Sequence, residues 1–274
     1  MIEIPESKNL ARQLTQALSG KVIWSVAAAA SPHGFAGYHG DPAEYPARLT
    51  GCQIDRADGF GGMVEIVAGD MRILFNDGIN LRYLEAGTPP PKKHQLLLVF
   101  GDGSALVCSV SMYGGMMAFK QGEEENGYIT GSRTKVSPLA DGFNRAYFEL
   151  LREATSEKLS AKAFLATEQR VPGLGNGVLQ DILFNARINP MKKLSALVGA
   201  DIDKLYDAVK TTLRDMTELG GRDTERDIFG NPCGYKTILS RNTLDQPCPV
   251  CGGAITKKAY MGGSVYYCGA CQPM

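Results

Sequence analysis

Four cysteines near the C-terminal end constrain the fold of this chain more than any other feature. They form two pairs, Cys248-Pro-Val-Cys251 and Cys268-Gly-Ala-Cys271, separated by residues 252–267. Two such pairs supply four thiolates, the usual ligand set of a tetrahedral structural zinc ion. A redox pair or a disulfide framework fits two CxxC motifs in an intracellular chain less well. The sequence therefore predicts one zinc ion, held by Cys248, Cys251, Cys268 and Cys271.

The segment between the cysteine pairs has the pattern of a β-hairpin. It contains Lys257, Lys258 and Tyr260, followed by a turn at Gly262-Gly263. Four thiolates leave no open coordination position, so this zinc is expected to be structural and to shape the hairpin.

A glycine-broken turn, Pro172-Gly173-Leu174-Gly175-Asn176, comes before a second informative stretch. Apolar residues then recur at helical spacing over 178–186, so the turn delivers Asn176 and Gly177 to the start of a helix. Glycines there permit positive φ and remove Cβ atoms, which would let a phosphate group bind the amide N–H groups of the helix end. The same pattern also fits an ordinary helix–turn–helix corner inside a core.

The composition is that of an ordinary globular chain. Its 274 residues, 44% hydrophobic and 21% charged, suggest one large or two modest domains. No apolar run approaches the ~18 residues of a membrane span and the N-terminus lacks a signal pattern, so we expect a cytoplasmic protein without a membrane partner. The net charge is zero, which argues against a purely electrostatic nucleic-acid binder. Residues 151–274 contain 16 Lys and Arg against 13 Asp and Glu, whereas residues 1–150 contain 13 against 16.

The hydrophobic pattern changes from strands to helices along the chain. A leading helix is predicted over 5–20, because Pro5 and Glu6 suit a first turn and Leu10 and Leu14 share a face. Strand patterns then follow to about residue 119, which suggests a β-sandwich. After Ser137-Pro138 the pattern is helical. The predicted strands are 22–26, 64–67, 71–75, 95–100 and 105–110, and the predicted helices are 143–151, 161–168, 177–186 and 202–219.

Taken together, these stretches resemble the formamidopyrimidine-DNA glycosylase / endonuclease VIII family over nearly the whole chain. The turn at 172–177 resembles the family's helix–two-turn–helix, and the match continues through Ile188-Asn189-Pro190. The resemblance implies an α+β multidomain fold. We expect an N-terminal β-sandwich with a leading helix (1–135), a helical helix–two-turn–helix DNA-binding domain (136–240) and a four-cysteine zinc ribbon (241–274).

The N-terminus both matches the family and departs from it. Family members expose a proline amine that attacks the sugar and forms a Schiff base, with an adjacent Glu as acid/base. Here Glu3 and Glu6 match, but Ile2 replaces the proline. Because Ile is large, Met1 is expected to be retained. The resemblance therefore implies Glu3 and Glu6 as catalytic residues, with the displaced α-amine of Met1 as the remaining candidate nucleophile.

The resemblance also implies DNA contacts. Asn176 matches the family's phosphate-binding Asn and His94 a DNA-contacting His. Ile79, Met112 and Tyr113 fall on loops that fill the gap left by a flipped base, with Met112 in place of an Arg. Lys257 and Lys258 lie in the hairpin that enters a DNA groove. The family's catalytic Lys falls on Phe60 and the Arg of its zinc finger on Gly263, so both cations are missing.

One basic segment has two interpretations. The region 220–235 resembles the family's lesion-covering loop. Arg222, Arg226 and Lys236 can accordingly form a DNA face, or can belong to a solvated helix end.

These observations predict a base-excision-repair DNA glycosylase that removes a modified base, with AP-lyase activity reduced or absent. The alternative is a DNA-damage or DNA-structure binding protein that has lost catalysis, and a zinc protein unrelated to DNA is a third interpretation. The expected partner is duplex DNA with a modified base or an abasic site, bound by a monomer in the cytoplasm (at the nucleoid if prokaryotic). The lesion itself is not indicated.

Overall fold

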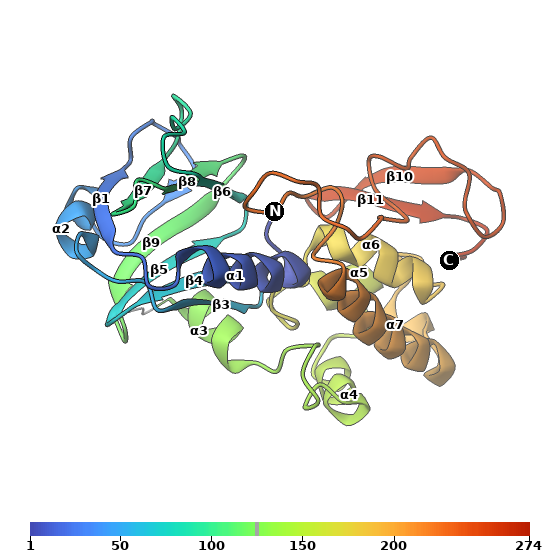
Figure 1. Cartoon of the computed structure of the whole chain (residues 1–274). Coiled ribbons are helices and arrows are strands. Elements are labelled where there is room, and N and C mark those ends of the chain that lie inside the picture. The colour runs from blue at the N-terminus through green and yellow to red at the C-terminus, as the bar shows by residue number, and fades with distance from the viewer. Residues whose placement is uncertain (124–125) are drawn as a thin grey trace.

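The fold is described by a computed structural model that covers residues 1–123 and 126–274. Figure 1 shows strands gathered on one side, helices and a separate β-hairpin on the other, and the N-terminus between them. The predicted α+β architecture is confirmed.

Two sheets form the predicted β-sandwich. One has the strand order β1-β7-β8-β6 and the other the order β2-β9-β5-β4-β3. All pairings are antiparallel except β2 with β9. The strands of the first sheet are β1 (Ile23–Ala28), β6 (Ile79–Leu84), β7 (Leu96–Phe100) and β8 (Ala105–Val110); those of the second are β2 (Ala36–Gly37), β3 (Arg56–Phe60), β4 (Met63–Ala68), β5 (Met71–Asn76) and β9 (Gly114–Lys120).

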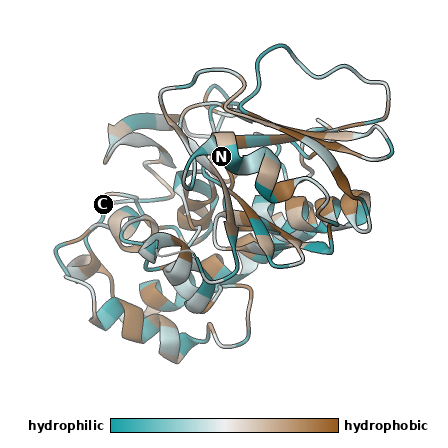
Figure 2. Cartoon of the chain, turned by 90° about the vertical axis from the view of Figure 1, so that its left-hand side faces the viewer, coloured by the Kyte–Doolittle hydropathy of each residue, from teal (hydrophilic) through white to brown (hydrophobic). Residues whose placement is uncertain are grey.

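The space between the sheets is filled by alternating apolar side chains. Ile73 and Phe75 of one sheet share a buried core with Leu98 and Leu106 of the other. Apolar residues are accordingly concentrated along the strands in Figure 2. Short turns join β4 to β5 and β7 to β8, and each of these pairs is antiparallel.

Helix α1 (Ile4–Leu18) leads into the sandwich and lies over β3 and β4. Leu10, Leu14 and Leu18 are buried in the sandwich core, and Pro5 lies in the first turn as predicted. The expectation of strands throughout 21–119 was wrong at one place, because α2 (Tyr45–Leu49) interrupts them. This helix is too short to produce a visible period in the sequence.

The helical region contains α3 (Gly127–Thr134), α4 (Arg145–Glu153), α5 (Ala161–Ala166), α6 (Asn176–Asn185) and α7 (Gly199–Glu218). Four of these were predicted to within a few residues, and α3 was missed. The helix predicted from Phe143 begins two residues later in the structure because Asn144 caps α4, accepting a hydrogen bond from the Tyr147 N–H at 2.9 Å. Helices α6 and α7 pack together around Val178, Leu183 and Leu213.

The C-terminal hairpin, β10 (Ile255–Tyr260) and β11 (Gly263–Cys268), packs against α6. Gln180 on α6 fixes it, because its Oε1 accepts the Tyr266 N–H at 3.0 Å and its Nε2 donates to the Ser264 carbonyl at 3.2 Å.

The cores cross the expected domain boundaries. Ile4 from the leading helix is buried in the helical core, and Ile228, which follows α7, is buried in the sandwich core. The Ile228 carbonyl also accepts the Tyr83 N–H at 2.7 Å. The division at 135/136 and 240/241 therefore stays a prediction. Among helices of the described residues, none has the length and apolar composition needed for a membrane crossing.

Candidate active site

Glu3 lies where the start of α1 meets the start of α6. Its side chain is 3% exposed, and its two carboxylate oxygens accept the N–H groups of Gly177 and Val178, each at 2.8 Å. The positive end of α6 thus faces the Glu3 carboxylate. The prediction that these amides bind a phosphate group is wrong, because Glu3 occupies them.

Gly175 and Gly177 leave room for the side chains that meet at the start of α6. A Cβ atom at Gly175 would lie 2.7 Å from the Glu3 carboxyl carbon, and one at Gly177 would lie 1.4 Å from Arg222 Nη1. The two positions therefore lack side chains because Glu3 and Arg222 fill that space.

Arg222 joins Glu3 to Glu6 inside the protein. It is 3% exposed; its Nε and Nη2 atoms donate to the two Glu6 oxygens at 3.0 and 2.9 Å, and Nη1 lies 3.5 Å from Glu3 Oε1. The Arg222 backbone N–H also donates to Glu6 at 2.9 Å. Both interpretations of Arg222 from the sequence, a DNA face and a solvated helix end, are wrong, because two buried carboxylates required a buried cation.

The two carboxyl groups titrate in opposite directions. Burial raises the pKa of Glu3 above its ordinary range, with a further increase from the charge of Glu6. Burial acts on Glu6 as well, but the charge and hydrogen bonds of Arg222 outweigh it and lower the pKa of Glu6. Such separation of two pKa values is typical of an acid/base pair, and here it leaves Glu3 as the group able to carry a proton.

The N-terminus is fixed beside this cluster. The α-amine of Met1 donates to Glu225 Oε2 at 2.6 Å, and the Met1 carbonyl accepts from Arg222 Nη2 at 3.2 Å. The next N–H, of Ile2, donates to the Asp77 carbonyl at 2.7 Å. Met1 is 37% exposed, so its amine is held in place at the edge of open space.

Two hollows meet at Met1 and Asn176. The first, of about 440 Å³, contains Glu3 in its wall; it is also lined by Asp77, Met112, Tyr113, Lys162 and Asn176. The second, of about 450 Å³, has a mainly polar lining that includes Asn80, Gln180, Thr224, Glu225 and Tyr266.

Three predicted DNA contacts are brought together with Glu3 at the first hollow. Met112 and Tyr113 are 64% and 46% exposed, so their apolar surfaces are available. Asn176 lies beside the hairpin, where its Nδ2 donates to the Ser264 carbonyl at 2.9 Å. The buried Oδ1 atom of Asn176 has no hydrogen-bond partner among the described residues.

The prediction of Ile79 as a wedge was wrong. It is 3% exposed in the sandwich core, with its side chain beneath Gly114, and its neighbour Asn80 faces the second hollow instead. Because successive residues of a strand point to opposite faces, a one-residue error in register exchanges a buried for an exposed side chain.

Other predicted residues lie outside the first hollow. His94 is at the end of the sheet, with its Nδ1 2.8 Å from the Pro91 carbonyl. Lys257 and Lys258 are exposed on β10, and Lys257 Nζ lies 5.9 Å from the Tyr266 ring centre. Glu6 is engaged with Arg222 and lines neither of the two hollows.

Sequence reasoning missed four residues of this region: Asp77, Tyr128, Lys162 and Glu225. Lys162 is 4% exposed; its Nζ donates to the Tyr260 carbonyl at 2.7 Å and so joins α5 to the hairpin, and burial lowers its pKa. The dipeptide Asp77-Gly78 carried a turn signal, but nothing in the sequence placed it next to residues 1–3.

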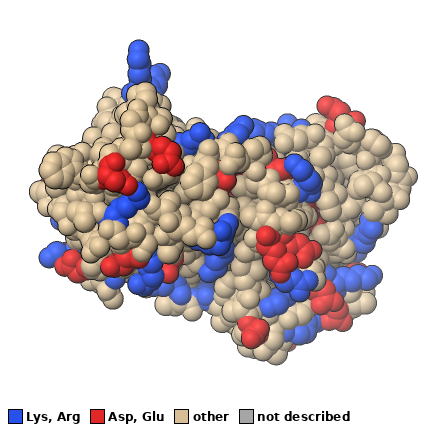
Figure 3. All heavy atoms as spheres, in the orientation of Figure 1, with Lys and Arg blue, Asp and Glu red and all other residues tan. Residues whose placement is uncertain are grey.

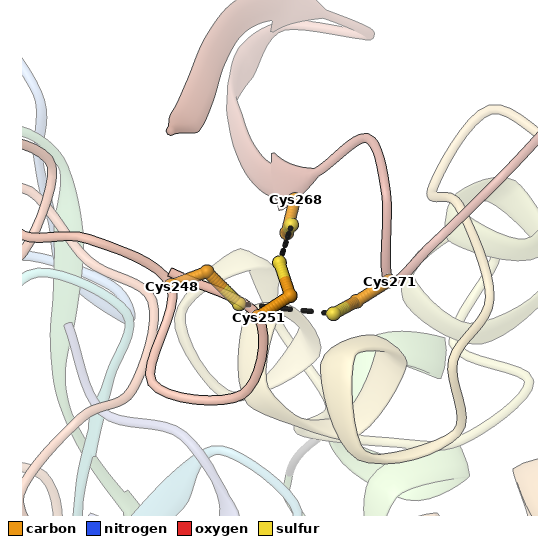
Figure 4. A group of neighbouring side chains, drawn as sticks. All are labelled: Cys248, Cys251, Cys268 and Cys271. Carbon is orange, nitrogen blue, oxygen red and sulfur yellow. Dashed lines mark hydrogen bonds between the residues drawn. The ribbon is translucent and has the colours of Figure 1, made fainter. Parts of the chain in front are cut away.

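The predicted zinc site is confirmed by the cysteine geometry. Figure 4 shows the four thiols converging, with Cys248 Sγ 3.8 Å from Cys271 Sγ and Cys251 Sγ 3.5 Å from Cys268 Sγ. All four sulfurs lie within 4.8 Å of one another. Zn–S bonds of about 2.3 Å in a tetrahedron require sulfurs about 3.8 Å apart, so the set fits one zinc ion. Phe184 and Leu239 pack against Cys248 and Cys268, which ties the site to α6.

Charges of both signs are present on the face of the molecule shown in Figure 3, where Lys and Arg are interspersed with Asp and Glu. This face therefore does not present a uniform positive field.

The fold and this site define an α+β protein with a zinc-bound hairpin. A buried Glu–Arg–Glu cluster lies between its two lobes, the β-sandwich and the helical region. No family profile matches the chain. The formamidopyrimidine-DNA glycosylase of Bacillus cereus is 25% identical over 100% of this chain and 99% of its own length. That of Lactobacillus delbrueckii subsp. bulgaricus is 26% identical over 99% of each.

Solved structures agree in fold. A complex between the Lactococcus lactis Fpg and an abasic site containing DNA has a TM-score of 0.84 at 21% identity, covering 99% of this chain and 100% of that one. The MutM (Fpg) protein from Thermus thermophilus has a TM-score of 0.81 at 23% identity and 98% coverage of both. The chain is therefore similar over its full length to formamidopyrimidine-DNA glycosylases, and it shares the fold of the solved Fpg proteins.

Proposed function

We propose that this protein is a base-excision-repair DNA glycosylase that removes a modified base from duplex DNA, with AP-lyase activity reduced or absent. The observation that carries the proposal is Glu3: a buried carboxyl group with a raised pKa in the wall of a hollow between the lobes. The full-length relatives carry the name of a DNA glycosylase, and a solved relative binds DNA that contains an abasic site.

The two hollows suggest how a nucleotide would be bound. Enzymes that act on a base inside a duplex first rotate it out of the stack. The sugar would then lie beside Glu3, and the polar second hollow would receive the base. Glu3 would donate its proton to the leaving base, a role for which a raised pKa is suited. Met112 and Tyr113 would occupy the gap left in the duplex.

Asn176 is placed to contact the DNA backbone. Its Nδ2 donates one N–H to the Ser264 carbonyl and would donate the second to a phosphate oxygen. The zinc-bound hairpin would follow Asn176 into a groove, with Lys257 and Lys258 as its cations. We propose that a monomer binds duplex DNA in this way, in the cytoplasm, and at the nucleoid in a prokaryotic cell.

The Met1 amine is a candidate nucleophile for residual lyase activity. It would have to lose a proton and leave Glu225 before attacking the sugar. Because Ile2 replaces the family's proline, we expect this route to be slow and hydrolysis to dominate.

The proposal is tested by measuring base release from a panel of duplexes, each with one modified base, using protein with its native N-terminus. We expect a free base from at least one lesion, and a loss of about 100-fold or more in Glu3→Gln. Glu44→Gln, at an exposed glutamate, is the matched control. Tight binding without release of any base would show instead that catalysis has been lost. Borohydride trapping on abasic DNA measures the Met1 route, because only a Schiff base is captured.

A further inference from the structure

A second carboxyl group faces the hollow that contains Glu3. Asp77 lies in the turn between β5 and β6, with the positive φ of 53° that few residues other than glycine adopt. Its turn is fixed on two sides. The Asp77 carbonyl accepts the Ile2 N–H at 2.7 Å, and the neighbouring Gly78 N–H donates to the Tyr113 carbonyl at 2.9 Å. Asp adopts this conformation readily in turns, so these two backbone contacts fix the turn beside the N-terminal residues.

The side chain of Asp77 is half-buried among groups of the same site. Its Oδ1 accepts a hydrogen bond from the Tyr128 hydroxyl at 3.4 Å. Burial raises the pKa of Asp77, while the Tyr128 hydroxyl and the Met1 ammonium group lower it less strongly. The pKa of Tyr113 is raised by burial and by the charges of both Asp77 and Glu3, and all three residues line the same hollow.

This hollow has room and an unsatisfied polar atom. Its volume is about 440 Å³ and both Glu3 and Asp77 line it, and the buried Oδ1 of Asn176 in its wall has no partner among the described residues. Glycoside hydrolysis commonly uses two carboxyl groups, one that protonates the leaving group and one that activates water.

Resting on the proposed glycosylase function, we propose that Asp77 is the catalytic base that activates the attacking water, with Glu3 as the acid. The bond from C1′ to the base nitrogen breaks, its electron pair leaves with the base, and the base takes the proton of Glu3. The water oxygen bonds to C1′ and gives its proton to Asp77. The products are the free base and an abasic sugar, and solvent returns both carboxyl groups to their starting states. The route needs no amine, which accounts for a site in which Ile2 stands where the family has its nucleophile.

The test compares Asp77→Asn with the wild type in single-turnover base release and in binding to an abasic-site analogue. Asn tolerates positive φ, so the turn is expected to remain folded. We expect release to fall about 100-fold or more, with binding unchanged within about threefold. Asp70→Asn, at an exposed turn aspartate, is the matched control and should release base at the wild-type rate.

A pH profile distinguishes a base from a structural residue. Release by the wild type should rise with pH as Asp77 loses its proton, and Asp77→Asn should lack this limb. The charged and titratable groups that line the hollow together with Asp77 are Met1, Glu3, Tyr113, Tyr128 and Lys162. Tyr128→Phe removes a hydrogen bond that lowers the Asp77 pKa, so the limb should move to higher pH; this variant also serves if Asp77→Asn does not fold.

The outcomes separate this proposal from the function on which it rests. Wild-type release by Asp77→Asn, with Glu3→Gln inactive, overturns the role of Asp77 and leaves the glycosylase intact. Trapping of the wild type by borohydride at a rate equal to base release also overturns it, because the amine would then replace water. If the wild type releases no base from any lesion, both proposals fail.

Discussion

Two regions of the protein meet at Asn176. The side chains of one are already paired with each other without DNA, whereas those of the other are exposed. On one side, Glu3, Glu6 and Arg222 are each 3% exposed and fully engaged with one another and with the end of α6. On the other side, the rim formed by Met112, Tyr113 and Gly263 is open and carries no charge at the positions where the family resemblance leads one to expect cations. The groups around Glu3 are therefore fixed before DNA binds, whereas the rim offers DNA few charged contacts.

The buried side also holds the lobes together. Glu3 comes from the start of α1, its amide donors from α6, and Arg222 from the segment after α7. Burying three ionised or ionisable groups is costly unless each is paired. The cost is offset here by hydrogen bonds to both carboxylates, which fix the position of Glu3 relative to the rim.

The largest effect is expected from removing the zinc ion that shapes the hairpin. Cys268→Ser should lower the bound zinc from one ion per chain to none, since the site has four ligands and no spare. Structural zinc sites contribute about 10–16 kcal/mol in isolated peptides, so the hairpin should lose its protection from hydrogen exchange, and abasic-site DNA should bind at least ~10-fold more weakly. Cys52→Ser, outside the cluster, should keep its zinc. A zinc-free variant with unchanged DNA affinity would show that the hairpin is not part of the grip.

A second prediction concerns the buried side. Arg222→Met keeps most of the side-chain volume but leaves two buried carboxyl groups without their cation. We expect the free energy of unfolding to fall by about 3–5 kcal/mol at pH 7, measured by urea denaturation. Arg214→Met, at an exposed ion pair with Asp215, should change it by less than about 0.5 kcal/mol. Equal small effects of the two substitutions would contradict a preorganised cluster.

A third prediction concerns the effect of Arg222 on the pKa of Glu6. It compares Glu6 with Asp181, a buried carboxyl group that lacks a salt-bridge partner among the described residues. Asp181 accepts the N–H groups of Ile238 and Leu239 at 2.9 and 2.8 Å, and burial raises its pKa from 3.8 to about 6. The folded state therefore keeps this proton longer than the unfolded state as pH rises. Stability from this group is fully present below pH ~4 and is lost as pH rises through ~6, a total change of roughly 3 kcal/mol.

The measurement is the difference in unfolding free energy between the wild type and Asp181→Asn, taken at pH 4 and pH 6. Between these two pH values the difference should shift by roughly 2 kcal/mol in favour of the variant at pH 6. For Glu6, whose pKa is lowered, the wild type should instead gain relative to Glu6→Gln as pH rises through the acid range. The same sign for both variants would contradict the assignment of Arg222 as the partner of Glu6.

The smallest expected effect concerns the rim. Gly263→Arg adds a cation at the hairpin turn, where a new Cβ would lie 3.4 Å from Asn176 Nδ2, an ordinary contact. Affinity for duplex DNA should rise about 5- to 10-fold at low salt, and the slope of log K against log [salt] should steepen by about 1. Gly263→Ala adds the Cβ without the charge and should leave the slope unchanged. An unchanged slope in Gly263→Arg would place the DNA away from this turn.

Features set by residues close together in the sequence could be predicted, whereas contacts between distant residues could not. The zinc site and the strands β1, β4, β5, β7 and β8 follow from local spacing, so they were predicted, whereas β2, β3, β6 and β9 were missed. Glu3 was found through its place in the N-terminal motif. Arg222 was misassigned because its partners lie more than 200 residues away in the chain, and no local pattern reports such a pairing. The prediction of Ile79 as a wedge was wrong because the register of a strand depends on its partner strand.

The same limit applies to the glycine-rich turn. The sequence showed correctly that Gly175 and Gly177 clear space at the start of α6. It could not show that the space is filled by the chain's own Glu3 and Arg222, because a missing Cβ says nothing about what takes its place.

The central claim is that the preformed Glu3 site is where DNA is processed. A crystal structure of the protein with a duplex that contains a stable abasic-site analogue tests it most directly. The account predicts C1′ of the analogue within hydrogen-bonding reach of the Glu3 carboxyl group, directly or through one water that also contacts Asp77, with Asn176 on an adjacent phosphate. A duplex bound elsewhere, with the hollow at Glu3 closed to the sugar, would contradict it.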